Sequence, residues 1–140
     1  MQKRIVVCFV ALLFFVSCNP TGNTVNLTDP VEAGREFIDA SLKGNYAKAK
    51  KYVLADSINM EYFNRYESFN KNLSSNEKDG YKNANIIIDS IQNISDSVTI
   101  INYSNTFKRS PGKVKLLKID KEWLVDFKFT FLGNSDYGNK

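Results

Sequence analysis

The chain has 140 residues and a formal net charge of +4, with 19 lysine and arginine residues against 15 aspartate and glutamate residues. It contains no histidine, which excludes the commonest general base and metal ligand of proteins from any site that it forms. A charge this small, without aromatic residues interleaved in the basic stretches, also argues against nucleic acid as a partner.

The first 18 residues, MQKRIVVCFVALLFFVSC, have the pattern of an export signal. Lys3 and Arg4 precede an unbroken apolar run of 12 residues, Ile5 to Val16, which is too short to span a membrane comfortably. The run ends in Phe-Val-Ser-Cys, a variant of the lipobox of bacterial lipoproteins. We therefore expect a signal peptide over residues 1–17 and lipidation of Cys18. The alternatives are an ordinary signal peptide or an uncleaved anchor.

Residues 18–28 are polar after the cysteine and lack any periodic pattern, so we expect a flexible tether. Acyl chains on Cys18 would hold the protein on a membrane of the bacterial cell envelope. No acidic cluster follows Cys18, which favours the outer membrane with the domain facing the periplasm. Loss of Cys8 with the signal leaves the folded part without a free thiol, so packing must supply its stability.

The stretch from Asp29 to Leu54 predicts a helical hairpin. Asp29 followed by Pro30 is a helix start signal, and apolar residues then recur at helical spacing. Gly44 is placed to end this helix, and Asn45 to cap a second, shorter one.

Two segments resemble a family of bacterial lipoproteins that share a domain of unknown function, number 4878. The run from Asp29 to Val53, D-P-x-x-x-x-x-E-F-I-D-A-x-x-K-G-N-Y-A-K-A-K-K-Y-V, is similar to the family's opening. The run from Lys113 to Asp126, K-V-K-L-L-K-I-D-K-E-W-L-V-D, resembles its closing hairpin. The resemblance covers residues 29–131 and implies the cone-shaped, cystatin-like fold of nuclear transport factor 2. It implies no activity, because the family has none assigned.

A third helix is predicted to start at Asp56 or Ser57. Its apolar stripe falls at steps of three and four residues and is widened by Phe63. The stripe consists of Ile58, Tyr62, Tyr66, Phe69 and Leu73. The polar residues 74–80, SSNEKDG, predict a loop.

After Gly80 the pattern changes to that of strands, which we expect over residues 83–92, 98–107, 113–119 and 123–131. In the last of these, aromatic and apolar residues alternate with polar ones from Trp123 to Phe131. The predicted fold class is α+β, with three N-terminal helices packed on a curved four-stranded antiparallel sheet. Residues 29–132 form one domain and residues 133–140 a tail. The strand over 123–131 is expected to face the third helix.

Five aromatic residues are candidates for a ligand pocket at the mouth of such a cone, or alternatively for its core. They are Tyr62, Tyr66, Tyr103, Trp123 and Phe127. Asp89 and Asp126 could act with Tyr103 as acid–base groups, although their phase on the strands favours solvated carboxylates. We expect no catalytic residue, no metal site and no cofactor.

Two surface patterns remain. Asp-Ser-apolar tripeptides at Ser57, Ser90 and Ser97 match an O-glycosylation signal of some Gram-negative gut bacteria; the alternatives are capping at Ser57 and turn chemistry at Ser97. Basic residues also gather around the third strand, which we interpret as an edge strand protected by lysines, or as a contact for a membrane surface or an acidic glycan. These basic residues are Lys108, Arg109, Lys113, Lys115, Lys118 and Lys121.

Two functions are therefore open. The first is a non-catalytic lipoprotein that binds a protein, peptide or glycan partner in the cell envelope. The second is a small-molecule binder or a cryptic enzyme that uses the cavity of the cone. An interior filled by Trp123 and the phenylalanines would favour the first, and a cavity with two or more convergent polar groups would favour the second.

Overall fold

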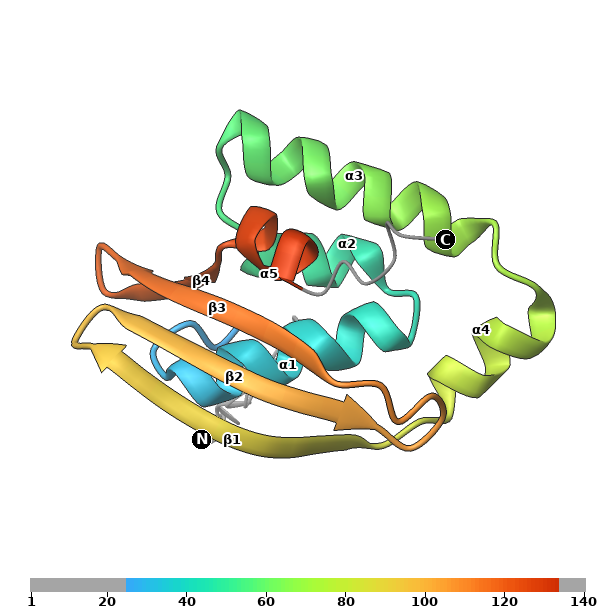
Figure 1. Ribbon diagram of the computed structural model, residues 1–140. Helices are drawn as coiled ribbons and strands as arrows, with labels where there is room; N and C mark the ends of the chain where they lie inside the picture. The colour runs from blue at the N-terminus through green and yellow to red at the C-terminus, as the bar shows by residue number, and fades with distance from the viewer. Residues whose placement is uncertain (1–24, 134–140) are drawn as a thin grey trace, which may run out of the picture.

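The computed structural model describes residues 25–133, so Cys18 and the expected signal peptide lie outside the described residues. Five α-helices, one short 3-10 helix and four antiparallel strands make up an α+β fold, with four of the α-helices before the sheet and one after it (Figure 1). In chain order the elements are α1 (Pro30–Leu42), α2 (Tyr46–Ala49), η1 (Lys50–Tyr52), α3 (Ser57–Lys71), α4 (Ser75–Lys82), β1 (Ile86–Ser95), β2 (Val98–Asn105), β3 (Gly112–Ile119), β4 (Glu122–Val125) and α5 (Phe127–Gly133).

The helical hairpin is confirmed, with the local hydrogen bonds that its sequence suggests. The Asp29 carboxylate accepts the backbone N–H groups of Val31 and Glu32, both at 2.9 Å, which satisfies donors that an α-helix leaves free at its start. Gly44 then takes a left-handed conformation, φ +70°, and ends the helix. The Asn45 side chain caps α2 by accepting the Lys48 N–H at 3.1 Å.

The strands form a meander in the order β1-β2-β3-β4, and the sheet curves around α1 (Figure 1). We expected the third helix to lie against the sheet, but α1 contacts all four strands while α3 packs against α5. Gly34 permits this close approach of α1, since a Cβ at that position would lie 2.4 Å from Cδ1 of Ile101.

The prediction of a loop over residues 74–80 was wrong, and this segment begins α4. The Ser74 hydroxyl accepts the Glu77 N–H at 3.3 Å, and the Glu77 carboxylate accepts the Ser74 N–H at 3.3 Å. This reciprocal capping box stabilises a helix that carries no buried residue of its own. Together with α5, it raises the number of α-helices from the three expected to five.

The long strand predicted over 123–131 was also wrong beyond Val125. The chain leaves the sheet at Asp126, whose carboxylate accepts the Phe129 N–H at 3.2 Å and so caps α5. Phe127 and Phe131 stand four residues apart, a spacing that fits one face of a helix as well as one face of a strand. The contact of α5 with α3 selects the helix.

The buried face of α3 differs from the predicted stripe. Phe63 is fully buried and Asn59 nearly so, whereas Ile58 and Phe69 are 49% and 61% exposed. Asn59 explains this rotation, because its side-chain oxygen accepts the Lys128 N–H at the start of α5, at 2.8 Å. Its amide group also donates to Asp56 at 2.7 Å. The face that meets α5 therefore has a polar residue at its centre.

One edge of the sheet is closed by the chain itself. The Trp123 N–H donates to the Leu27 carbonyl at 2.7 Å, and the Leu54 N–H donates to the Val125 carbonyl at 3.1 Å, both on β4. Since β4 pairs with β3, the interpretation of the third strand as a lysine-protected edge was wrong. The other edge of the sheet is β1.

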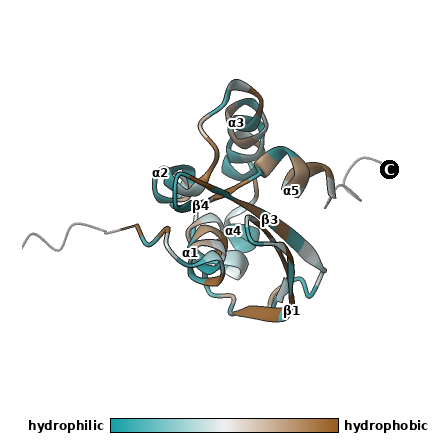
Figure 2. Cartoon of the chain, turned by 90° about the vertical axis from the view of Figure 1, so that its left-hand side faces the viewer, coloured by the Kyte–Doolittle hydropathy of each residue, from teal (hydrophilic) through white to brown (hydrophobic). Residues whose placement is uncertain are grey.

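The core lies between α1, the concave face of the sheet and the α3–α5 layer. Figure 2 shows hydrophobic colour along the sheet and on α5, which border this core. The completely buried side chains include Phe63, Ile101, Leu116 and Val125, from four different elements.

Candidate functional site

Three of the five predicted pocket residues meet in one cluster of aromatic rings between α3 and α5. The Phe127 ring lies 5.4 Å from Tyr66, 5.3 Å from Phe63 and 6.0 Å from Phe131, measured between ring centroids. The Tyr62 ring joins this cluster through its contact with Phe131, and the two ring centroids are 5.5 Å apart. Tilted and edge-to-face contacts of this kind are the favourable geometries for aromatic pairs.

The two other residues lie apart from this cluster. Trp123 is only 6% exposed, and the Lys118 ammonium stands 5.8 Å from the centre of its ring on the outer side. Tyr103 extends over Gly112 of the neighbouring strand, where a Cβ would come within 2.8 Å of the phenol ring. The expected pocket between the third helix and the sheet is therefore occupied by rings and by α5.

The Tyr66 hydroxyl has an unusual environment. Burial raises its pKa well above the ordinary value, and the neighbouring phenols of Tyr103 and Tyr46 add to the effect. The Tyr46 ring packs edge-on against Tyr66, with 6.1 Å between centroids. Sequence reasoning missed Tyr46 as a neighbour of Tyr66. A phenol with a raised pKa stays neutral, so Tyr66 is suited to donating a hydrogen bond and not to acting as a base.

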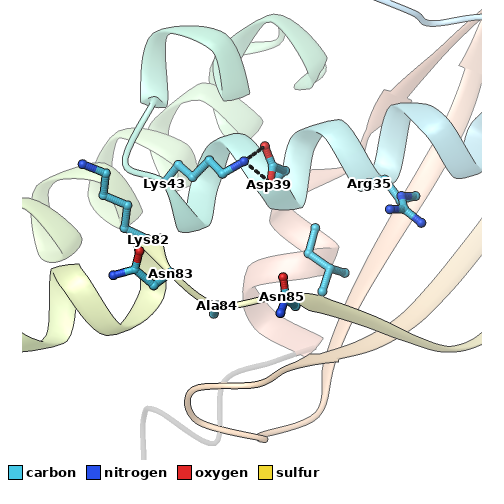
Figure 3. A pocket seen from close by; sticks show the side chains of 8 residues that line it. Arg35, Asp39, Lys43, Lys82, Asn83, Ala84 and Asn85 are labelled. Atoms are coloured by element: carbon cyan, nitrogen blue, oxygen red, sulfur yellow. Dashed lines mark hydrogen bonds and ion pairs between the residues drawn. The ribbon is translucent and has the colours of Figure 1, made fainter.

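A shallow groove on the surface, with a volume of about 270 Å³, is one candidate site (Figure 3). It runs between the outer side of α1 and the segment that leads from α4 into β1. Its lining residues are Arg35, Asp39, Lys43, Lys82, Asn83, Ala84, Asn85 and Ile86. None of them was predicted, because the two walls lie about forty residues apart in the chain and share no motif.

The groove carries an excess of positive charge. Lys43 pairs with Asp39 at 2.7 Å along the α1 wall, while Arg35 and Lys82 lie toward opposite ends (Figure 3). Neither Arg35 nor Lys82 has a carboxylate within ion-pairing distance among residues 25–133. Three cations against one carboxylate leave a local charge of +2, which favours an anionic group of a ligand.

The wall of the groove formed by the α4–β1 segment is held by hydrogen bonds. The Asn83 amide group donates to the Asp79 carbonyl at 2.9 Å and closes the end of α4. The Asn85 N–H donates to the Thr106 hydroxyl at 2.9 Å, and the Asn85 carbonyl accepts the Thr106 N–H at 3.0 Å. The backbone of this wall is therefore fixed before any ligand binds. The groove offers cationic and amide donors but no acid–base pair.

The carboxylates considered for acid–base chemistry are not brought together. Asp89 is exposed on β1, at 3.5 Å from the Ser104 hydroxyl, whereas Asp126 follows β4 at the opposite edge and pairs with Lys115 at 3.0 Å. Tyr103 lies on β2 between them. Within residues 25–133 no cluster of histidine, cysteine, aspartate and glutamate side chains is placed to hold a metal ion.

A second hollow, of about 440 Å³, lies beside α5. It is lined by Asp126, Lys128, Phe129, Leu132 and Gly133. The Lys115 ammonium stands 4.9 Å from the Phe129 ring centre.

The three serines of the proposed glycosylation tripeptides are all exposed. Ser57 is the first residue of α3, but the helix is capped by Asp56, so the alternative of capping at Ser57 was wrong. The Ser90 hydroxyl accepts the Asn102 amide at 2.9 Å, and the Ser97 N–H donates to the Ser95 hydroxyl at 3.3 Å in the β1–β2 turn. Glycosylation stays a prediction.

Comparison of the chain with protein-family models, with curated proteins and with solved structures finds no match. In the part of the chain that the structure describes, no helix has the length and apolar character needed to cross a membrane.

Proposed function

We propose that this protein is a lipid-anchored binding protein of the bacterial cell envelope. Cys18 carries the anchor, in the outer membrane, and the domain faces the periplasm. The domain contacts a protein, peptide or glycan and performs no catalysis. We also assign it to the cone-shaped, cystatin-like class of folds; the curvature of the sheet around α1 supports this assignment.

One observation favours binding over catalysis. An enzyme of this fold class would hold its substrate in the interior of the cone, and here side chains fill that interior. Phe127 and Phe63 are 3% and 0% exposed, and Trp123 is 6% exposed. A small-molecule site needs a concave space with a few convergent polar groups. The candidate acids Asp89 and Asp126 stand at opposite edges of the sheet, so they do not converge on the interior.

The groove of Figure 3 is the surface that we assign to partner binding. Its fixed backbone wall and its excess of cations suit a carboxylate or another anionic group presented by a glycan or an acidic peptide. Binding there would be electrostatic and solvent-exposed, so we expect it to weaken as ionic strength rises.

Photo-crosslinking in intact cells tests this assignment. A photoreactive amino acid replaces Asn83 in the groove or, as a matched control, Asn72 at the end of α3. Both positions are exposed helix C-caps with the same backbone angles, φ −93° and ψ −1°, and both side chains donate to the carbonyl four residues earlier.

We expect a discrete adduct from position 83 that is absent from position 72. Equal labelling from both positions, or none from position 83, would remove the groove as the binding surface. Native mass spectrometry of the full chain from its own host tests the filled interior separately. A small molecule that stays bound after the groove is blocked would contradict the non-catalytic proposal.

A further inference from the structure

One face of the sheet has no helix over it. Gly34 of α1 lies against Ile101 of β2 and Leu116 of β3, which marks the concave, buried face. Successive residues of a strand point to opposite faces, so the residues next to these two lie on the convex face. In Figure 1 helix α1 passes behind β2 and β3, and among residues 25–133 no helix lies in front of these strands.

Apolar side chains gather on one half of this convex face. Val98 stands opposite Leu117, and Leu117 stands opposite Leu124 on its other side. Ile100 extends this row along β2, and Ile119 extends it along β3. Four of the five residues are half-buried, and Ile119 is 45% exposed. Within the described residues none of the five belongs to the core or packs against it. We call these five residues the convex patch.

The convex patch is confined to the end of the sheet that carries the β1–β2 and β3–β4 turns. The Lys118 N–H donates to the Ser97 carbonyl at 2.9 Å, which places the two turns side by side. Toward the other end the same face becomes polar, where Ser90, Asn102 and Lys113 stand next to one another across β1, β2 and β3. The apolar character therefore belongs to one end of the domain.

The N-terminal segment joins the sheet at this same end. The Trp123 N–H donates to the Leu27 carbonyl at 2.7 Å, and Leu124 of the convex patch is the next residue of β4. Leu27 comes nine residues after Cys18, a stretch of chain that reaches at most about 30 Å when fully extended. A membrane that holds Cys18 is therefore never far from the convex patch.

We propose that the convex patch lies on the phospholipid surface to which Cys18 is anchored, with its apolar side chains in the membrane interface. The inference rests on the lipid anchor of the proposed function. A short linker gives the tethered surface an effective concentration in the millimolar range, so a weak contact suffices. A partner protein in solution lacks this advantage and needs about 20 interface residues a side, far more than the convex patch provides.

The charges near the convex patch indicate a contact that is chiefly apolar. The Lys115 ammonium, on the convex face, pairs with Asp126 at 3.0 Å. The two turns carry two lysines and three carboxylates, which are Lys118, Lys121, Asp96, Asp120 and Glu122. They offer no net attraction to anionic headgroups, so we expect the contact to persist as ionic strength rises, in contrast to binding in the groove. The groove lies at the opposite end of β1 and stays open to the periplasm.

Full-length, acylated protein in phosphatidylcholine vesicles tests the proposal. Flotation with the vesicles first establishes the anchor. An environment-sensitive fluorophore is then attached to Ile119→Cys or, as a matched control, to Ile58→Cys on α3, where the isoleucines are 45% and 49% exposed. We expect a blue shift of the emission and quenching by nitroxide-labelled lipid at position 119, and neither at position 58. Raising the salt from about 0.1 M to 1 M shortens the screening length from about 10 Å to 3 Å and should leave the quenching unchanged.

A second set of variants tests the apolar contact itself. With the fluorophore on Ser97→Cys in the neighbouring turn, Ile119→Asp should reduce the quenching, whereas Ile58→Asp should not. Circular dichroism of each variant establishes that it is folded. Equal quenching at positions 119 and 58 in protein that floats, or quenching lost at high salt, would overturn the inference and leave the anchor standing. Protein that does not float would overturn the anchor and the inference together.

Discussion

Replacing Phe127 by alanine tests both the filled interior and the end of the last strand. The Phe127 ring is 3% exposed and stands at the centre of four other rings. Its ring-to-ring distances are 5.9 Å to Phe37, 5.3 Å to Phe63, 5.4 Å to Tyr66 and 6.0 Å to Phe131.

Phe127→Ala should lower the free energy of unfolding by about 3–5 kcal/mol, the range for truncating a buried phenylalanine to alanine. The four surrounding rings come from α1, α3 and α5, and rigid rings on three elements cannot close the space by small shifts. A domain of this size has a total stability of about 5–15 kcal/mol, so the variant should fold but melt about 12–25 °C lower.

Urea denaturation followed by fluorescence gives the measurement. Trp123 is the single tryptophan of the chain and is 6% exposed, so it reports on unfolding directly. Phe129→Ala is the matched control, since Phe129 is 36% exposed on the other side of α5 and its loss should cost less than about 1 kcal/mol.

Equal costs at the two positions would refute the reasoning. If the strand continued to Phe131, Phe127 and Phe129 would lie on the same face and be equally buried. In α5 they lie on different faces of the helix and are buried to different extents. A second readout follows from the void: benzene should raise the melting temperature of Phe127→Ala and leave the unchanged protein unaffected, since apolar cavities of ring size bind such ligands. No rise would mean that the rings collapse into the space.

Three further predictions concern single contacts. Asn59→Ala should cost about 1–3 kcal/mol in urea denaturation, because the Lys128 N–H loses its acceptor at the start of α5; a change under 0.5 kcal/mol would contradict this role. Hydrogen bonds from Ser74 lower the pKa of Glu77. The ionised Glu77 carboxylate should therefore stabilise α4 at any pH above the ordinary glutamate pKa, and this stabilisation should disappear as the pH falls through the lowered pKa of Glu77. Glu77→Gln should remove the same stabilisation. Amide exchange of α4 checks this, and a loss that does not depend on pH would exclude the carboxylate. Cys18→Ala should move the protein from the membrane to the soluble fraction on cell fractionation, and retention in the membrane would refute lipid anchoring at this residue.

Local signals in the sequence predicted the parts of the fold that local hydrogen bonds decide. Asp29, Asn45 and Asp56 each cap the helix that they were expected to start. The strands β2 and β3 were also found near their predicted positions. The capping signal of Ser74 and Glu77 was present as well, but the polar composition around it was interpreted as a loop.

Local signals in the sequence could not predict the candidate site. Arg35 and Lys82 share a groove only because α1 turns its outer side toward the segment after α4. Three of the five predicted aromatic residues meet in one cluster, yet whether such rings line a cavity or fill it depends on where α5 lies. Tyr46 reaches Tyr66 through the packing of α2 on α1, which the pattern of neither helix reveals.

The sequence by itself determined the starts of α1, α2 and α3 and the α+β class, because these depend on hydrogen bonds between residues a few positions apart and on the period of apolar side chains. Only the tertiary structure decided that Phe127 begins a helix and that β1 is the open edge. An alternating aromatic segment satisfies a strand and a helix equally well until Asn59 of α3 supplies an acceptor for one of them. An edge likewise exists only once the order of strands is set.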